Sequence, residues 1–164
     1  MMAKAKTDGV FLERTQALLA RADELCARRG VRLTDLRRQV LGTILDAGSP
    51  VGAYDILNRL RVFRPGATPP SVYRTLDFLL SQGFVHRLER LSAFVGCLAR
   101  EGEDHSAQFL ICRNCGKVLE LEDSAVNEAL MRAARHVGFA MRHATVEAEG
   151  ICQACAVLKP AAGV

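Results

Sequence analysis

The stretch PPSVYRTLDFLLSQGFVHRLERLSAFVGC, residues 69–97, decides the fold of the first half of the chain. After the two prolines, apolar residues recur at helical spacing as far as Gly83, and Ser71 is placed to cap the helix. Two short apolar segments, residues 84–88 and 93–97, follow and are separated by a polar turn, which is typical of a β-hairpin. Helices followed by such a hairpin form a winged helix-turn-helix.

Three more helices are predicted upstream of this stretch. Apolar residues at helical spacing indicate one over residues 11–29, which Gly30 ends. A second has Thr34 at its N-cap and ends at Gly48, and a third begins near Ala53. We therefore predict an α+β protein in which residues 1–98 form an N-terminal winged helix-turn-helix domain.

The composition of the chain changes after the predicted hairpin. Residues 100–106 are charged and poor in apolar side chains, which indicates a hinge over 99–107. Beyond it, strands are predicted at 108–111, 117–121 and 139–148, with a helix at 124–136. Residues 108–164 are thus predicted to form a second, small α/β domain.

Charge is distributed unevenly between the two halves. Residues 1–90 hold 15 Lys and Arg against 9 Asp and Glu, whereas residues 91–164 hold 7 against 9. A basic first half favours binding to nucleic acid, although a solvated arginine-rich surface explains the same imbalance. No apolar run approaches the roughly 20 residues that span a bilayer, and residues 1–9 lack the apolar segment of a signal peptide. We therefore expect a cytoplasmic protein that does not bind membranes.

Six cysteines in a cytoplasmic chain favour metal binding over disulfides, because that compartment keeps thiols reduced. Four of them form two C-x-x-C motifs, which match the Cys₄ pattern of structural zinc: Cys112, Cys115, Cys152 and Cys155. A redox pair or unlinked core cysteines are the alternatives.

A second set of metal-ligand types mixes imidazole, thiolate and carboxylate: His86, Cys97, His105 and Glu120. No local motif joins these residues, and each could be an ordinary surface or core residue, but all four could converge where the two domains meet. A thiolate among the ligands favours Zn²⁺ over the harder Mn²⁺. We therefore expect two zinc ions per chain, one holding the fold and one binding reversibly.

A zinc hydrolase could use the mixed set, with Glu120 as the base. Four protein ligands would leave no open position for water, and no H-E-x-x-H motif is present, so we expect neither an enzyme nor a small-molecule substrate. A redox-responsive DNA-binding protein is a further alternative.

The helix after the two prolines is the expected recognition helix, whose first residues would meet base edges in the major groove. Arg74 could make a bidentate contact to guanine, and Tyr73 could touch a thymine methyl or a phosphate. Ser71 is a predicted DNA contact on the same helix. In the alternative interpretation Tyr73 packs in the core and Arg74 is a surface cation.

The order of these motifs resembles that of the ferric uptake regulator family and, within it, the zinc uptake regulator branch. The resemblance runs from about Phe11 to Cys155 and is carried by five segments, namely 69–76, 83–86, His105, Cys112-Arg113-Asn114-Cys115-Gly116 and Cys152-Gln153-Ala154-Cys155.

The resemblance implies a homodimeric repressor that binds palindromic operator DNA when zinc is bound and controls zinc uptake genes. It implies that the second domain dimerises and that Tyr73 and Arg74 lie on the recognition helix. It assigns the regulatory zinc to the mixed set, His86, Cys97, His105 and Glu120, and the structural zinc to the four cysteines of the C-x-x-C motifs.

One departure from the family pattern concerns a third metal site. The iron-sensing branch commonly has an H-H-x-H run before the first C-x-x-C, whereas this chain has Glu103-Asp104-His105-Ser106. A third site built from Asp104, Glu122 and His143 is therefore not expected. Sensing of iron or peroxide is the alternative within the family, and the Cys97 thiolate counts against it.

Overall fold

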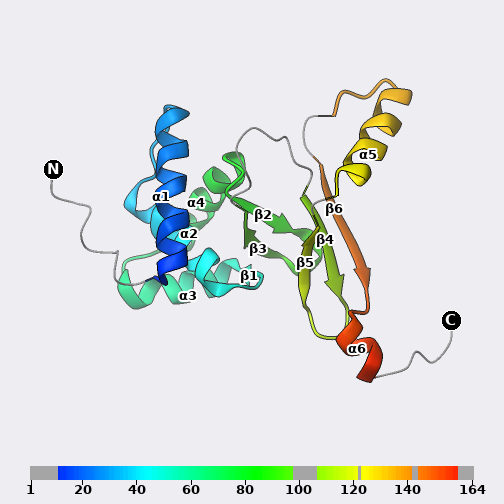
Figure 1. Cartoon of the computed structure of the whole chain (residues 1–164). Coiled ribbons are helices and arrows are strands. Elements are labelled where there is room, and N and C mark those ends of the chain that lie inside the picture. The colour runs from blue at the N-terminus through cyan, green and yellow to red at the C-terminus, as the bar shows by residue number, and fades with distance from the viewer. Residues whose placement is uncertain (1–10, 98–106, 122, 142–143, 159–164) are drawn as a thin grey trace. The chain divides into compact units, whose positions relative to one another are not determined.

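The computed structural model of the chain describes residues 11–97, 107–121, 123–141 and 144–158 (Figure 1). The chain divides into two compact units, Met1–Leu98 and Ala99–Val164. The predicted hinge over 99–107 lies outside the described residues except for Ala107, which is the first residue of a strand.

The first unit is a four-helix assembly with a small antiparallel sheet. Its elements are α1 (Glu13–Arg28), α2 (Asp35–Ala47), β1 (Val51–Gly52), α3 (Ala53–Phe63), α4 (Pro69–Ser81), β2 (Val85–Leu88), a 3₁₀ turn (Glu89–Leu91) and β3 (Ala93–Gly96). The strand order is β1-β3-β2, so the predicted hairpin is extended by a short strand before α3 that the sequence pattern did not indicate. The winged helix-turn-helix prediction is confirmed, with α3 and α4 as the helix pair and β2–β3 as the wing.

The core of the first unit lies where the apolar stripes of the helices meet. Its fully buried side chains include Leu19, Ile44, Leu60, Leu79 and Phe84, which come from all four helices and the start of the wing. Each helix therefore buries one face against the others, and this burial is the main stabilising contribution.

Three arginines tie the helices together at the edge of this core. Arg38 Nη1 lies 2.7 Å from Asp23 Oδ2, which joins α2 to α1. Arg29 donates to the Gln82 carbonyl oxygen at 2.7 Å, and the Arg37 guanidinium lies 3.4 Å from the centroid of the Phe78 ring. Part of the positive charge of the first half thus holds α1, α2 and α4 together. The net positive charge of this half is therefore not by itself evidence of a nucleic-acid-binding surface.

The second unit contains a three-stranded sheet with one helix between two of its strands. Its elements are β4 (Ala107–Cys112), β5 (Val118–Leu121), α5 (Ser124–His136), β6 (Thr145–Gly150) and α6 (Gln153–Leu158). The order is β5-β4-β6, with β4 antiparallel to β5 and parallel to β6. Figure 1 shows α5 near the start of β6 and α6 directly at its end.

Two predictions for the second unit need correction. The last strand begins at Thr145 and not at Phe139, because Gly138 has φ 72° and the Phe139 amide turns back to donate to the Ala134 carbonyl oxygen. The short helix α6, which carries Cys155, was not predicted. Among the described residues, no helix is both long and apolar enough to cross a bilayer.

Gly42, inside α2, allows close packing against Phe11. A Cβ at this position would lie 2.6 Å from Phe11 Cε2. Alanine is normally favoured over glycine in a helix by about 1 kcal/mol, but we expect Gly42→Ala to lower the free energy of unfolding by about 1–3 kcal/mol through overpacking. Urea unfolding measures this change. The double variant Gly42→Ala/Phe11→Leu should recover part of the loss, and a Gly42→Ala protein more stable than the parent would contradict the packing described.

Candidate metal centre and nucleic-acid interface

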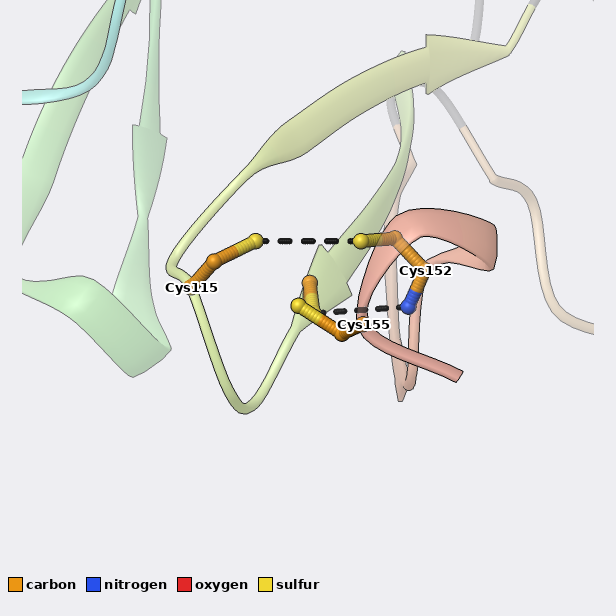
Figure 2. A group of neighbouring side chains, drawn as sticks. Cys115, Cys152 and Cys155 are labelled. Atoms are coloured by element: carbon orange, nitrogen blue, oxygen red, sulfur yellow. Dashed lines mark hydrogen bonds between the residues drawn. The ribbon is translucent and has the colours of Figure 1, made fainter. Parts of the chain in front are cut away.

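The four cysteines of the C-x-x-C motifs come together at one end of the second sheet. Their sulfur atoms all lie within 4.8 Å of one another. Figure 2 shows Cys115, on the loop before β5, and Cys152, just before α6, with their sulfur atoms facing each other. Because β4 and β6 are parallel and Cys112 is in register with Gly150, the two motifs follow the ends of these strands at the same end of the sheet. This pairing brings the motifs together although they lie far apart in the sequence.

Backbone hydrogen bonds fix the loop that carries Cys112 and Cys115. The Cys112 amide donates to the Lys117 carbonyl oxygen, and the Gly116 amide donates to the Cys112 carbonyl oxygen, both at 2.9 Å. Gly116 has φ 70°, a left-handed conformation that glycine adopts without strain. The Arg113 amide also donates to the Gly150 carbonyl oxygen at 2.9 Å, so the loop is joined to the end of β6.

The spacing of the sulfur atoms fits a tetrahedral metal site. Cys115 Sγ and Cys152 Sγ are 3.7 Å apart, and none of the four clustered cysteines forms a disulfide. A disulfide would require about 2.0 Å. Four thiolates around zinc at about 2.3 Å would lie about 3.8 Å from one another, which is the edge of the tetrahedron. The cluster therefore has the donor set and the spacing of a Cys₄ zinc site.

Two of these thiols have shifted pKa values in opposite directions. The Cys152 amide donates to Cys112 Sγ at 3.3 Å, and this bond, together with the Cys115 amide, lowers the pKa of Cys112 to about 6. Hydrogen bonds with the thiols of Cys115 and Cys152 raise the pKa of Cys155 to about 12. At neutral pH Cys112 is thus a thiolate and Cys155 a thiol. Ionising all four thiols requires a cation, and binding one would release protons.

The first unit brings two residues of the mixed set together. His86 on β2 is paired with Val95 on β3, and Cys97 lies two residues beyond Val95, so both side chains point to the same face of the wing. Their ligand atoms lie within 4.8 Å of each other. The Cys97 amide donates to the Phe84 carbonyl oxygen at 2.9 Å, which extends the pairing past the end of β3. The wing therefore presents a half-buried imidazole and a buried thiol side by side.

The other residues of the mixed set belong to the second half of the chain. Glu120 lies on β5, is exposed, and is paired with Phe109 on β4. His105 lies outside the described residues, as do Asp104, Glu122 and His143. The convergence of Glu120 and His105 with His86 and Cys97 therefore stays a prediction.

The predicted recognition helix exposes two of its three proposed DNA contacts. Tyr73 is 48% exposed, so it does not pack in the core, and Arg74 is exposed with its Nε donating to the Pro70 carbonyl oxygen at 3.3 Å. The N-cap of α4 is Thr68 and not Ser71 as predicted, so the cap lies three residues earlier and both prolines belong to the first turn of the helix. Ser71 Oγ accepts from the Thr68 amide at 3.1 Å and donates to the Thr68 carbonyl oxygen at 2.6 Å. The Ser71 hydroxyl is thus engaged in the capping box of α4.

The sequence analysis did not identify Tyr54, an exposed aromatic residue that lies beside Tyr73. Tyr54 lies in the first turn of α3, is 72% exposed, and lines a small hollow together with Tyr73. Its position on α3, off the buried stripe formed by Ile56, Leu57 and Leu60, was the signal that could have identified it.

The chain is similar to several known proteins. The model of the ferric uptake regulator family matches residues 28–149. The chain is 44% identical over 141 residues to the zinc uptake regulation protein of Escherichia coli K12, covering 86% of this chain and 82% of that protein. It is 28% identical over 137 residues to the peroxide operon regulator of Bacillus subtilis, covering 84% of this chain and 92% of the relative.

A solved structure of a zinc uptake regulator complexed with zinc and DNA has a similar fold, with a TM-score of 0.81. The two chains are 41% identical, and the match covers 92% of this chain and 100% of that one.

We expect Ser71→Ala to act through the capping box. The free energy of unfolding should fall by about 0.5–2 kcal/mol, the usual cost of losing a cap, and urea unfolding measures it. Ser81→Ala is the matched control, because the Ser81 hydroxyl is exposed at the other end of α4 and donates only to the Phe78 carbonyl oxygen. Unchanged stability with weaker DNA binding would instead assign Ser71 to the DNA interface.

Proposed function

Because this chain belongs to the ferric uptake regulator family, we propose that it is a cytoplasmic, zinc-responsive transcriptional repressor. It binds near-palindromic operator DNA as a homodimer when regulatory zinc is bound, and it controls zinc uptake genes. The observation that carries the proposal is the pair formed by His86 and Cys97, since these two metal-ligand types lie side by side on the wing of the DNA-binding unit itself.

The four clustered cysteines hold the structural zinc in this proposal. Among the described residues of the second unit, those that are buried all lie on β4: Ala107, Gln108, Phe109, Ile111 and Cys112. A unit with so small a core needs another source of stability. Zinc bound by four thiolates supplies folding free energy, because the site is complete only when β4, β6 and α6 are in place.

The regulatory zinc is held by His86, Cys97, His105 and Glu120. The wing that carries His86 and Cys97 follows α4 directly, because the Gly83 and Phe84 amides donate to the carbonyl oxygens of Leu80 and Leu79 at the end of that helix. The position of α4 is thus fixed relative to His86 and Cys97. Glu120 lies on the strand that follows the cysteine loop. Bound zinc would supply a cross-link between the rigid body that carries α4 and the unit that carries the cysteines.

Such a cross-link selects one arrangement of the two DNA-binding units in the dimer. A ligand shifts an equilibrium only through its different affinity for the two states, and moving the population from 1:99 to 99:1 takes about 5.5 kcal/mol. Four ligands from two units can give the two arrangements different affinities for zinc, because an arrangement that separates the units loses some of the coordination bonds.

The second unit supplies the dimer surface. Leu110, Leu119 and Leu121 on the sheet are 40%, 44% and 38% exposed, and Val126 and Leu130 form an exposed apolar stripe on α5. Apolar stripes of this kind are normally buried against a partner. A two-fold dimer places two copies of α4 in successive major grooves, so the operator has two related half-sites. In each half-site Arg74 contacts a guanine.

Zinc is preferred to iron as the sensed metal because of the ligand types. Cys97 contributes a thiolate, which suits zinc, whereas iron and peroxide sensing would favour histidine and carboxylate ligands. Metal analysis of the purified chain tests this preference directly. Two zinc ions per chain are expected, one of which exchanges at free-zinc concentrations that change operator binding.

Cys97→Ser should abolish zinc-responsive binding and leave the fold intact, because the regulatory site loses its thiolate while the four clustered cysteines remain. We expect a folded dimer with one zinc per chain whose affinity for operator DNA no longer rises with free zinc, measured by fluorescence anisotropy in zinc buffers. Cys26→Ala is the matched control, since it removes another buried thiol of the first unit. Unchanged zinc dependence in Cys97→Ser would show that Cys97 is not a regulatory ligand.

Cys112→Ser should instead damage the second unit. The variant loses the thiol that accepts the Cys152 amide and ends β4, so we expect loss of the tightly bound zinc and of the dimer. Zinc analysis and sedimentation measure these two properties. A stable dimer with full zinc content and full activity would exclude Cys112 as a structural ligand.

A further inference from the structure

Gly96 lies on the wing directly before Cys97, and the structure leaves no room for a side chain at this position. A Cβ at Gly96 would lie 2.5 Å from Leu45 Cδ2 and 3.3 Å from Leu45 Cγ. Gly96 is the last residue of β3, and its φ is not positive, so backbone conformation does not require glycine here. Glycine is required instead by the close approach of the wing to Leu45 on α2.

Leu45 forms a fixed support for this end of the wing. It is half-buried in the last turn of α2 and packs against the core of the first unit. Leu45 Cα would lie 3.8 Å from the same Cβ, which is van der Waals contact, so β3 passes close to the backbone of the helix. Because a packed interior has few voids, an added methyl group has to displace either Leu45 or the end of β3.

The end of β3 also determines where Cys97 lies. Gly96 is paired with Val85 on β2, and the Cys97 amide donates to the Phe84 carbonyl oxygen at 2.9 Å. The buried Cys97 thiol and the His86 imidazole have ligand atoms within 4.8 Å of each other, and both ligand types suit zinc. Zinc sites need their ligand distances within about 0.2 Å of the usual values. A small shift of the end of β3 would therefore weaken zinc binding.

We propose that the contact between Gly96 and Leu45 positions the Cys97 thiol for the regulatory zinc. Both are then positioning residues that set the zinc affinity of this site, although neither offers a metal ligand. The proposal rests on the proposed function, because it takes Cys97 as a regulatory ligand. Since the wing is packed against α2 before zinc binds, less free energy is lost in ordering the thiol.

Gly96→Ala tests the contact in the full-length protein. The added methyl group should push the end of β3 away from α2, so we expect the zinc affinity of the regulatory site to fall about tenfold, as for other changes to groups that orient metal ligands. Competition with a fluorescent zinc chelator measures this affinity without DNA. The tightly bound zinc should remain at one ion per chain, and operator affinity at saturating zinc should equal that of the parent.

Leu45→Ala tests the same contact from the helix and only removes atoms. Alone it should also weaken the regulatory zinc site, because the wing loses its support. The double variant Gly96→Ala/Leu45→Ala should recover most of the affinity, since the methyl group on the strand takes space that the leucine leaves. A purely destabilising effect of each substitution would instead make the double variant the weakest of the three.

Gly42→Ala is the matched control for overpacking. It also adds a methyl group at α2, where the Cβ would lie 2.6 Å from Phe11 Cε2, but this contact does not involve the wing. Urea unfolding of the zinc-free proteins compares the stability of Gly42→Ala with that of Gly96→Ala. We expect both to be less stable than the parent and only Gly96→Ala to bind regulatory zinc more weakly.

The possible failures are distinguishable. Unchanged zinc dependence in Cys97→Ser would overturn the assignment of Cys97 in the proposed function. If Cys97→Ser abolishes regulatory zinc binding while Gly96→Ala and Leu45→Ala keep the parent affinity, the positioning role alone is overturned. An equal loss of zinc affinity in Gly42→Ala, or no recovery in the double variant, would show that zinc affinity follows overall stability, and would also overturn it.

Discussion

The second unit is organised by four thiols that lie within 4.8 Å of one another. Amide hydrogen bonds from Cys152 and Cys115 lower the pKa of Cys112 to about 6, whereas hydrogen bonds with the thiols of Cys115 and Cys152 raise the pKa of Cys155 to about 12, and these opposite shifts conflict with ionisation of all four thiols at one pH. A divalent cation removes the conflict and stabilises all four thiolates. Because the unit buries few side chains, the joining of β4, β6 and α6 at this cluster contributes a large share of the stability of the unit.

The first unit, in contrast, is stabilised mainly by its hydrophobic core. It has a full hydrophobic core from four helices and the wing, and arginines directly after α1 and on α2 tie α1, α2 and α4 together at its edge. Because this core joins the helices to the wing, His86 and Cys97 bind zinc reversibly in the proposed function without unfolding the unit. This difference gives a physical basis for the proposed division between a structural zinc and a regulatory zinc.

Much of the fold could be predicted from local sequence patterns. The bounds of α5 agree with the predicted helix 124–136, and the four helices of the first unit appear where the apolar periodicity indicated them. The failures share a cause. β1 is two residues long, α6 is a single short helix, and the true start of β6 depends on the turn at Gly138 and on pairing with β4. Elements this short form because of partners distant in the sequence, and local propensity does not record such partners.

For the candidate sites too, some features follow from local sequence and others from contacts between distant segments. The sequence by itself determined the ligand types, the two C-x-x-C motifs and the helix that carries Tyr73 and Arg74, because these depend on residue chemistry and on spacing along one element. Tertiary structure decided the rest. The parallel pairing of β4 with β6 made the two motifs one cluster, and strand register put His86 and Cys97 on one face. Capping committed the Ser71 hydroxyl to its own helix, and the packing of α3 against α4 put Tyr54 beside Tyr73. These are contacts between separate segments, and only the folded chain sets their distances.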